Sequence, residues 1–173
     1  MSTWTEPTRH LPLWWGGYRG RYIAGLVTIV IGVAATNLTS TYSLWFLAIG
    51  PAIQGIGWLL LPSAPWRRLL VLLPCLLAGL ALLAGASFAG SFAVLLAGWL
   101  LARHRPLLSY LTVLFPSAAS FPLKTFAHEY GQNWIVLSVG TAVVVASSWL
   151  ARWIAMRMQK ARPIPSESEY TLR

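Results

Sequence analysis

The chain has 173 residues, of which 57% are hydrophobic and only 10% are charged. Soluble domains carry about 25% charged residues, so this composition excludes an ordinary soluble fold and indicates one compact domain in lipid. The net charge of +9 could suggest nucleic acid, but the basic residues lie between apolar runs and not along one face. That pattern is typical of loops around membrane spans, so we expect no nucleic-acid partner.

The apolar runs predict an all-α, polytopic membrane protein built as a compact bundle of six short transmembrane helices. Residues 1–21 mix tryptophans with arginines and are expected to lie at the membrane interface. The first two spans are predicted at 22–37 and 42–61, and a short polar turn joins them.

Residues 69–101 are almost free of charge and too long for one span. A single helix of this length would measure about 50 Å, whereas the hydrocarbon core is about 30 Å thick. The chain must therefore fold back, and its small and polar residues cluster between Gly85 and Ser91. This predicts a turn there, with the third and fourth spans at 69–84 and 87–101.

The last two spans are predicted at 107–121 and 134–154, followed by a basic tail at 156–173 that we expect to be disordered. The predicted division is thus an N-terminal segment at 1–21, a transmembrane domain at 22–155 and the tail. The alternative is five spans, with 107–121 only dipping into the membrane. Pro51, Pro74 and Pro116 lie inside predicted spans and are expected to kink them.

The distribution of basic residues predicts the orientation. With six spans and a cytoplasmic N-terminus, Lys124 is the single lysine or arginine left on the outer side. This asymmetry predicts a multi-pass protein of a bacterial plasma (inner) membrane with both termini in the cytoplasm. The cytoplasmic arginines would then contact the anionic headgroups of membrane lipids.

Small residues repeat at every fourth position in two predicted spans. They are Gly85, Ala89, Ala93 and Ala97 in the fourth span, and Ser138, Ala142 and Ala146 in the sixth. Such stripes let helices approach closely, so they predict packing within the bundle, with a homo-oligomer face as the alternative. Gln54 is expected to form a hydrogen bond between helices, and Cys75 to be a buried, unpaired thiol.

The predicted spans contain essentially no charged residue, which argues against a proton relay, a voltage sensor or a channel for charged substrates. Polar residues gather instead in the outer turns, so a site is expected at the outer face. We therefore predict a non-enzymatic binding, transport-accessory or scaffold subunit, with no cofactor and no metal. Its partners would be lipids and, beyond them, another protein or a second copy of the chain.

Two motifs support an alternative. Gly85-Ala86-Ser87 resembles the Gly-x-Ser motif that opens the fourth helix of rhomboid intramembrane serine proteases. Ala127-His128-Glu129-Tyr130-Gly131 resembles their Ala-His-x-x-Gly entry to the sixth helix. The resemblance implies that Ser87 and His128 meet near the outer face as catalytic residues. The histidine would take the serine proton, and hydrogen-bond donors would stabilise the oxyanion.

The chain departs from the rhomboid pattern at several positions. Phe88 follows the serine where rhomboids usually have a second glycine. The predicted second span has neither the histidine nor the asparagine of their oxyanion pair, and their long first outer loop is missing. The resemblance covers roughly the second half of the chain. It therefore favours an inactive relative, and a non-enzymatic function remains the first prediction.

Overall fold

The structure is a computed structural model that describes residues 17–126 and 133–160. Within these ranges the chain forms α-helices and short 3-10 helices and no β-strand. This confirms the predicted all-α fold class. The α-helices are α1 (Tyr18–Asn37), α2 (Phe46–Leu60), α3 (Pro65–Ala81), α4 (Ser91–Ala102), α5 (Leu114–Phe126) and α6 (Asn133–Lys160), and the 3-10 helices are η2 (Leu82–Phe88) and η3 (Leu107–Val113).

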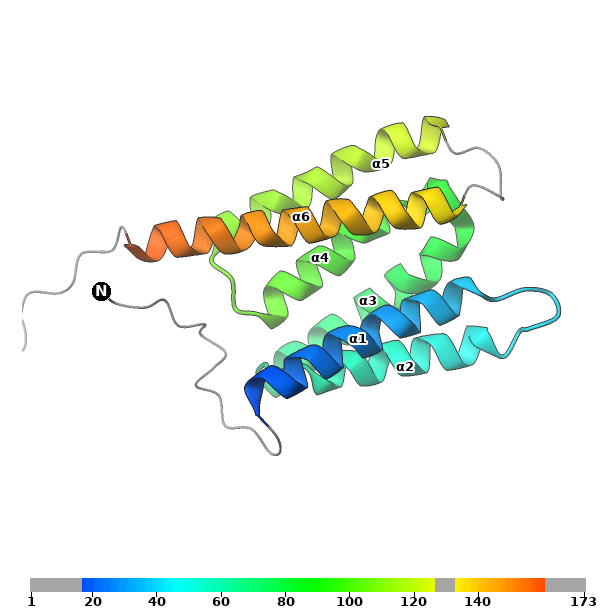
Figure 1. Cartoon of the computed structure of the whole chain (residues 1–173), viewed down its shortest axis with the longest axis horizontal. Coiled ribbons are helices and arrows are strands. Elements are labelled where there is room, and N and C mark those ends of the chain that lie inside the picture. The colour runs from blue at the N-terminus through cyan, green and yellow to red at the C-terminus, as the bar shows by residue number, and fades with distance from the viewer. Residues whose placement is uncertain (1–16, 127–132, 161–173) are drawn as a thin grey trace, which may run out of the picture.

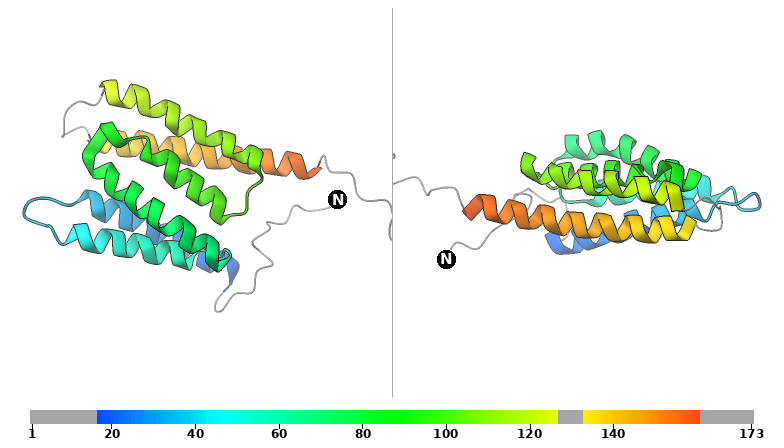
Figure 2. Two further views of the ribbon diagram at one scale, coloured as in Figure 1. Left: turned by 180° about the vertical axis from the view of Figure 1, so that it is seen from behind. Right: turned by 90° about the horizontal axis from the view of Figure 1, so that it is seen from above.

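Successive helices run in opposite directions along the long axis of the bundle (Figure 1). α1, α3 and the η3–α5 segment begin at one end, whereas α2, α4 and α6 begin at the other. The same alternation is visible from behind in Figure 2. As a result, the start of α1 and the end of α6 lie at the same end of the molecule.

Within the described residues, three helical segments are long and apolar enough to cross a membrane: Tyr18–Asn37, Pro65–Phe88 and Asn133–Met158. α2 and α4 are also apolar but shorter. The outward faces of the helices carry exposed large apolar residues such as Ile23, Leu73 and Val145. Lipid is the solvent that suits such a surface, because water would make this exposure unfavourable.

The closest helix pair is α1 with α2, and glycines form its interface. A Cβ atom built on Gly32 would lie 2.6 Å from the Cα of Gln54, and one on Gly57 would lie 2.7 Å from the backbone nitrogen of Ile29. Neither distance is possible for a real side chain, so the two backbones touch directly. Close backbone contact of this kind is the main source of helix association in lipid. The sequence analysis did not identify these glycines.

Gln54 joins three helices from a fully buried position. Its backbone packs on Gly32 of α1, and its Nε2 donates a hydrogen bond to the carbonyl oxygen of Cys75 in α3 at 2.9 Å. The predicted hydrogen bond between helices is therefore confirmed. Cys75 itself is buried and unpaired, as expected for the lone thiol.

The chain reverses between α3 and α4, within the predicted turn region. η2 continues α3 until Gly85, whose φ of 73° lies in the left-handed region that favours glycine. α4 then starts at Ser91, a full turn later than the predicted fourth span. On α4, Ala89 just before the helix and Ala93 within it are buried, as the predicted small-residue stripe requires.

The prediction that the small-residue stripe on α6 packs inside the bundle is wrong. Ser138, Ala142 and Ala146 are exposed. The side of α6 that faces the bundle is instead the side that contacts α4. The ring of Phe92 in α4 packs directly against the backbone at Gly140, where a side chain would collide with it. A Cβ atom on Gly140 would lie 2.5 Å from the Cδ2 of Phe92. The buried positions of α6 are Val136, Gly140, Ser147, Ala151 and Ala155.

Two helices extend beyond their predicted ends. α5 continues to Phe126 through Pro122, and its first turns form the 3-10 helix η3. α6 continues to Lys160, so the first residues of the tail that we expected to be disordered are helical. The length of an apolar run underestimates the length of both helices, because a helix can continue through polar residues beyond the hydrocarbon core.

Candidate binding site at the basic end

The alternating helix directions bring arginines from several helices to one end of the bundle, which we call the basic end. It comprises the starts of α1 and α3 and the ends of α4 and α6, whereas Lys124 lies near the end of α5 at the opposite, polar end. The described ranges contain no aspartate or glutamate. The arginines of the basic end are Arg19, Arg21, Arg67, Arg68, Arg103, Arg105, Arg152 and Arg157.

Two of these arginines bind the C-terminal end of α2. The Arg68 guanidinium donates to the carbonyl oxygens of Ser63 and, at 3.0 Å, of Leu59. The Nε of Arg21 donates to the carbonyl oxygen of Leu60 at 3.2 Å. The last carbonyls of a helix have no partner within it and carry partial negative charge, so guanidinium donors satisfy and stabilise them. The first turns of α1 and α3 thereby anchor the end of α2.

An arginine also binds the C-terminal end of α4. NH1 of Arg67 donates to the carbonyl oxygen of Leu101 at 3.1 Å. The backbone nitrogens of His104 and Arg105 donate to the carbonyl oxygens of Leu101 and Leu100, which is the Schellman pattern of a helix C-terminus. His104 has a φ of 54° at the position that glycine usually occupies. The arginine-rich loop after α4 is thus held in a defined conformation.

Replacing Arg68 with methionine is expected to lower the free energy of unfolding by about 1–2 kcal/mol, because the carbonyls of Leu59 and Ser63 lose a charged donor. Thermal unfolding can be followed in detergent with a fluorogenic thiol dye, since Cys75 is buried and becomes reactive on unfolding. Arg19→Met is the matched control, because Arg19 is an exposed arginine of the same end. Equal effects of the two variants would show that net charge, not capping, is responsible.

The loop after α4 also predicts a pH dependence. Burial, together with the nearby positive charge of Arg67, lowers the pKa of His104 from its ordinary value. The folded state therefore binds its proton less readily than the unfolded state does. The resulting stability is present above the unfolded pKa of about 6.5 and is lost as the pH falls from there through the lower pKa of the folded state.

We therefore expect the unfolding temperature to fall between about pH 7.5 and about pH 5.5, and to fall less in His104→Asn. Asparagine does not titrate and tolerates the left-handed backbone at this position. The measurement is thermal unfolding at both pH values with the Cys75 dye readout. An identical pH response in the two proteins would contradict a role for His104.

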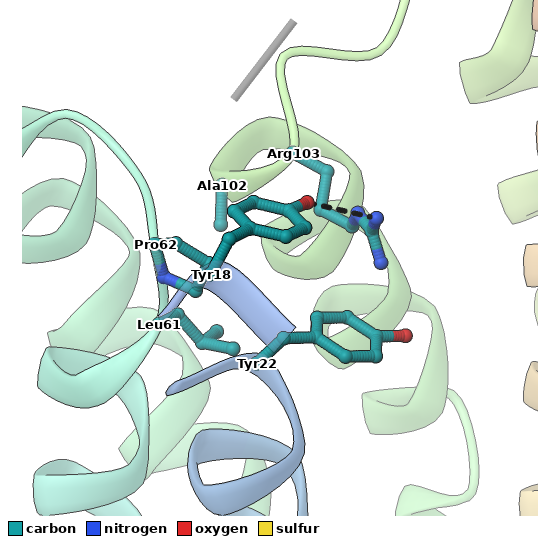
Figure 3. Close-up of a pocket in the computed structure, with 6 residues that line it drawn as sticks. All are labelled: Tyr18, Tyr22, Leu61, Pro62, Ala102 and Arg103. Atoms are coloured by element: carbon teal, nitrogen blue, oxygen red, sulfur yellow. Dashed lines mark hydrogen bonds between the residues drawn. The ribbon is translucent and has the colours of Figure 1, made fainter. Parts of the chain in front are cut away.

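A small hollow lies at the basic end between the start of α1, the α2–α3 loop and the end of α4 (Figure 3). Its free volume is about 10 Å³, which is room for about one water molecule and far below the roughly 300–1,000 Å³ of a typical small-molecule site. Its walls are amphipathic, with two phenol rings and one guanidinium facing apolar side chains. The lining residues are Tyr18, Tyr22, Leu61, Pro62, Ala102 and Arg103.

Arg103 is the charged group of this hollow, and aromatic residues position it. Its NH2 donates to the hydroxyl of Tyr18 at 3.3 Å. Its guanidinium carbon lies 4.5 Å from the ring centroid of Tyr22 and 5.5 Å from that of Trp99. These distances are within the range of cation–π attraction. Figure 3 shows the guanidinium beside the two tyrosine rings, with the Tyr18 hydroxyl directed to it.

Other arginines of the basic end also stack on tryptophans. Arg67 lies 5.0 Å from the ring of Trp66, and Arg157 lies 4.0 Å from that of Trp153. Both tryptophans are exposed. Aromatic rings with guanidinium groups at one level are typical of the boundary between hydrocarbon and headgroups. The basic end therefore has the side-chain chemistry of a membrane interface.

Ser87, the serine of the predicted dyad, lies elsewhere. Ser87 is exposed on η2 at the polar end. His128 lies outside the described residues, together with Ala127 and Gly131, so the structure does not test whether the two side chains meet. The turn that carries Ser87 does lie near the start of α6, because a Cβ atom on Gly85 would be 3.8 Å from the Oδ1 of Asn133.

Sequence reasoning missed the hollow, since it expected a site at the outer face. One signal was available: Tyr18 and Tyr22 are one helical turn apart, and Arg103 ends an apolar run. Their meeting depends on the packing of α1 beside α4, which neither segment encodes alone. No group of histidine, cysteine, aspartate or glutamate within the described residues is arranged to hold a metal ion.

Comparisons of this chain with protein-family models, with curated proteins and with solved structures find no match.

Proposed function

We propose that this chain is a non-enzymatic subunit of the bacterial plasma membrane, with a binding, transport-accessory or scaffold role. It crosses the membrane six times and keeps both termini in the cytoplasm. The observation that carries this proposal is the alternation of helix directions, which collects the arginines at one end and leaves Lys124 near the other. Basic residues are retained on the cytoplasmic side of membrane proteins, so the basic end would face the cytoplasm.

The contacts at the basic end favour a binding role over a catalytic one. Arg21, Arg67 and Arg68 hold the ends of neighbouring helices together. The hollow beside Arg103 offers a positively charged, aromatic surface but no cluster of acid, base and nucleophile. Such an end suits the capture of anionic headgroups or of an acidic segment of a partner protein.

A second copy of the chain is a further candidate partner. The exposed face of α6 carries Ser138, Ala142 and Ala146 at every fourth position. In lipid, a small-residue face of this kind lets a second helix approach closely. The stripe does not pack inside the bundle, so a homo-oligomer through α6 is the interpretation that remains for it.

Cysteine accessibility tests the topology. In a Cys75→Ala background, Thr41→Cys places an exposed thiol at the polar end, and Trp66→Cys places one at the basic end. An impermeant maleimide added to intact cells is expected to label the first variant and not the second. Permeabilised cells should label both. Labelling of Trp66→Cys in intact cells would reverse the orientation and remove the main support for the proposal.

A third variant separates six spans from five. Thr125 is exposed near the end of α5, close to Lys124. With six spans, Thr125→Cys should label in intact cells like Thr41→Cys. If 107–121 only dips into the membrane, this thiol stays on the cytoplasmic side and labels only after permeabilisation.

One observation favours the rhomboid-like alternative: the Gly85 turn that carries Ser87 lies near the start of α6, shortly after the His128 motif in the chain. A fluorophosphonate probe, which reacts with activated serines, distinguishes the two functions. The non-enzymatic proposal expects no labelling. Labelling that disappears in Ser87→Ala and His128→Ala, but persists in Ser91→Ala, would replace it with a serine protease function.

A further inference from the structure

The loop between α1 and α2, residues 38–45, projects past the ends of both helices at the polar end of the bundle (Figure 1). Its large side chains are turned outward: Tyr42 is 98% exposed, Trp45 79% and Leu44 63%. Residues 22–66 contain no lysine, arginine, aspartate or glutamate, so the loop is also uncharged. Exposing aromatic and aliphatic side chains to bulk water is unfavourable. The surface of the loop therefore suits a medium less polar than water.

The hydroxyl groups of this loop find partners within the loop or at the end of α1. The Oγ1 of Thr39 donates to the carbonyl oxygen of Thr36 at 2.7 Å. The Oγ of Ser43 donates to the carbonyl oxygen of Leu38 at 3.3 Å, and it pairs with the Oγ of Ser40 at 2.7 Å. Polar groups are costly outside water only when they have no hydrogen-bond partner. These internal bonds therefore lower the cost of moving the loop out of bulk water.

The packing of α1 on α2 places the loop at the height of the headgroups. α1 has 20 residues, so it is about 30 Å long and spans the hydrocarbon core from the basic end. Gly50 of α2 packs on Thr36, because a Cβ atom there would lie 2.8 Å from the Cα of Thr36. α2 starts four residues earlier, at Phe46, which is about 6 Å farther out. The headgroup layer is about 5–8 Å thick on each side, so Trp45 falls within it.

The composition of the loop matches this layer. Tyrosine and tryptophan concentrate at the boundary between hydrocarbon and water, because their rings are apolar and carry one polar group. The sequence between α5 and α6 is different, since it carries His128 and Glu129 shortly after Lys124. Charged groups of that kind favour water. The α1–α2 loop is thus the connection at this end whose residues suit the headgroup layer.

We propose that the α1–α2 loop is an anchor in the lipid headgroup layer, held there by Tyr42 and Trp45. This inference rests on the proposed function in one respect, namely that the chain lies in a membrane. The loop joins two helices whose backbones touch at Gly32 and Gly57, so the anchor fixes the depth of the α1–α2 pair as a unit. The headgroup layer is polar, so the thiol of Thr41→Cys remains within reach of a maleimide.

Fluorescence quenching in lipid nanodiscs of phosphatidylcholine and phosphatidylglycerol tests the position of the loop. The full-length protein, in a Cys75→Ala background, carries Leu44→Cys labelled with the dye NBD. A nitroxide on the lipid headgroup is expected to quench this dye at least about twofold more strongly than a nitroxide near the end of the acyl chain. Val145→Cys, which is exposed in the middle of α6, is the matched control and should show the reverse order.

The role of the aromatic residues is tested by combining Tyr42→Ser with Trp45→Ser. In this double variant, headgroup quenching of the dye on Leu44→Cys should fall about twofold, and quenching by aqueous iodide should rise about twofold. Trp134→Ser removes another exposed tryptophan of the polar end and should change neither value. If the double variant loses helical circular dichroism, Tyr42→Ser alone replaces it, because a side chain that is 98% exposed contributes no packing. The same direction of change is then expected.

The other outcomes overturn the proposal. Quenching by iodide alone would place the loop in water, and stronger quenching by the acyl-chain nitroxide would place it in hydrocarbon. Weak quenching by all three reagents would mean that protein, such as a second copy of the chain, covers the loop. Unchanged quenching in the aromatic variants would mean that Tyr42 and Trp45 do not hold it.

This result is independent of the topology experiment, because both leaflets of a membrane have a headgroup layer. If cysteine labelling reverses the orientation while the headgroup nitroxide still quenches the loop, the proposed orientation fails and the anchor stands. The opposite combination leaves the membrane subunit intact and removes the anchor.

Discussion

Gly32→Ala is expected to lower the free energy of unfolding by about 2–3 kcal/mol, a large overpacking effect for a single added methyl group. The new Cβ would lie 2.6 Å from the Cα of Gln54, so it would collide with backbone and not with a side chain that can rotate away. α1 and α2 would have to separate, and the Gln54 hydrogen bond to Cys75 would be strained with them. Thermal unfolding in detergent, read by dye labelling of Cys75, measures the effect.

The same helix provides the control. Gly20 also lies in α1, but no atom would come within 4 Å of a Cβ atom there. Gly20→Ala should therefore stabilise the protein by about 0.5–1 kcal/mol, because alanine has the higher helix propensity. If both variants were equally stable, the close packing of α1 on α2 would be contradicted.

Gly140→Ala is expected to have a similar effect between α4 and α6, with a cost of about 2 kcal/mol. Its Cβ would lie 2.5 Å from the Cδ2 of Phe92, a buried ring with little room to move. Gly90→Ala is the control at the start of α4, where the nearest packed neighbour of a Cβ atom is the Oγ of Ser120 at 3.9 Å. That variant should unfold at close to the wild-type temperature.

A second substitution makes this prediction specific. Phe92→Leu removes part of the ring and should cost about 1–2 kcal/mol alone, through the space it leaves. In the double variant the methyl group of Ala at position 140 enters that space, so the combined cost should be less than the sum of the single costs. Additive costs would mean that the two positions do not touch, and that α6 presents another side to α4.

The two ends of the bundle differ in the hydrogen bonds that their polar side chains form. At the basic end, guanidinium groups satisfy the last carbonyls of α2 and α4, and this fixes the position of Arg103 beside α1. At the polar end, the side chains of Thr36 and Asn37 donate to carbonyl oxygens of their own helix, those of Gly32 and Val33. Arginine contacts between helices therefore mark the basic end, whereas the count of polar loop residues had favoured the outer face.

The features that depend on solvation and on local backbone conformation could be predicted from the amino-acid sequence alone. Long apolar runs without charge require helices, since a backbone in lipid must satisfy its own hydrogen bonds. An uncharged run of about 50 Å as a helix, against a hydrocarbon core of about 30 Å, requires a reversal. Gly85 marks the place where the backbone turns. Cys75 is buried because a lone thiol behaves as a small hydrophobic group. Gln54 bonds to a neighbouring helix because a buried amide without a hydrogen-bond partner is costly.

Which helix faces meet could be seen only in the folded bundle. The stripe at Ser138, Ala142 and Ala146 has the correct spacing for close packing, yet Gly140 is the α6 position that α4 contacts. Likewise, the glycines of α1 and α2, and the arginines that hold the ends of α2 and α4, have their roles only because particular helices are neighbours. Spacing within one helix shows that a face can pack. The choice of partner is made by contacts between residues far apart in the chain, whose energies are summed over the whole bundle.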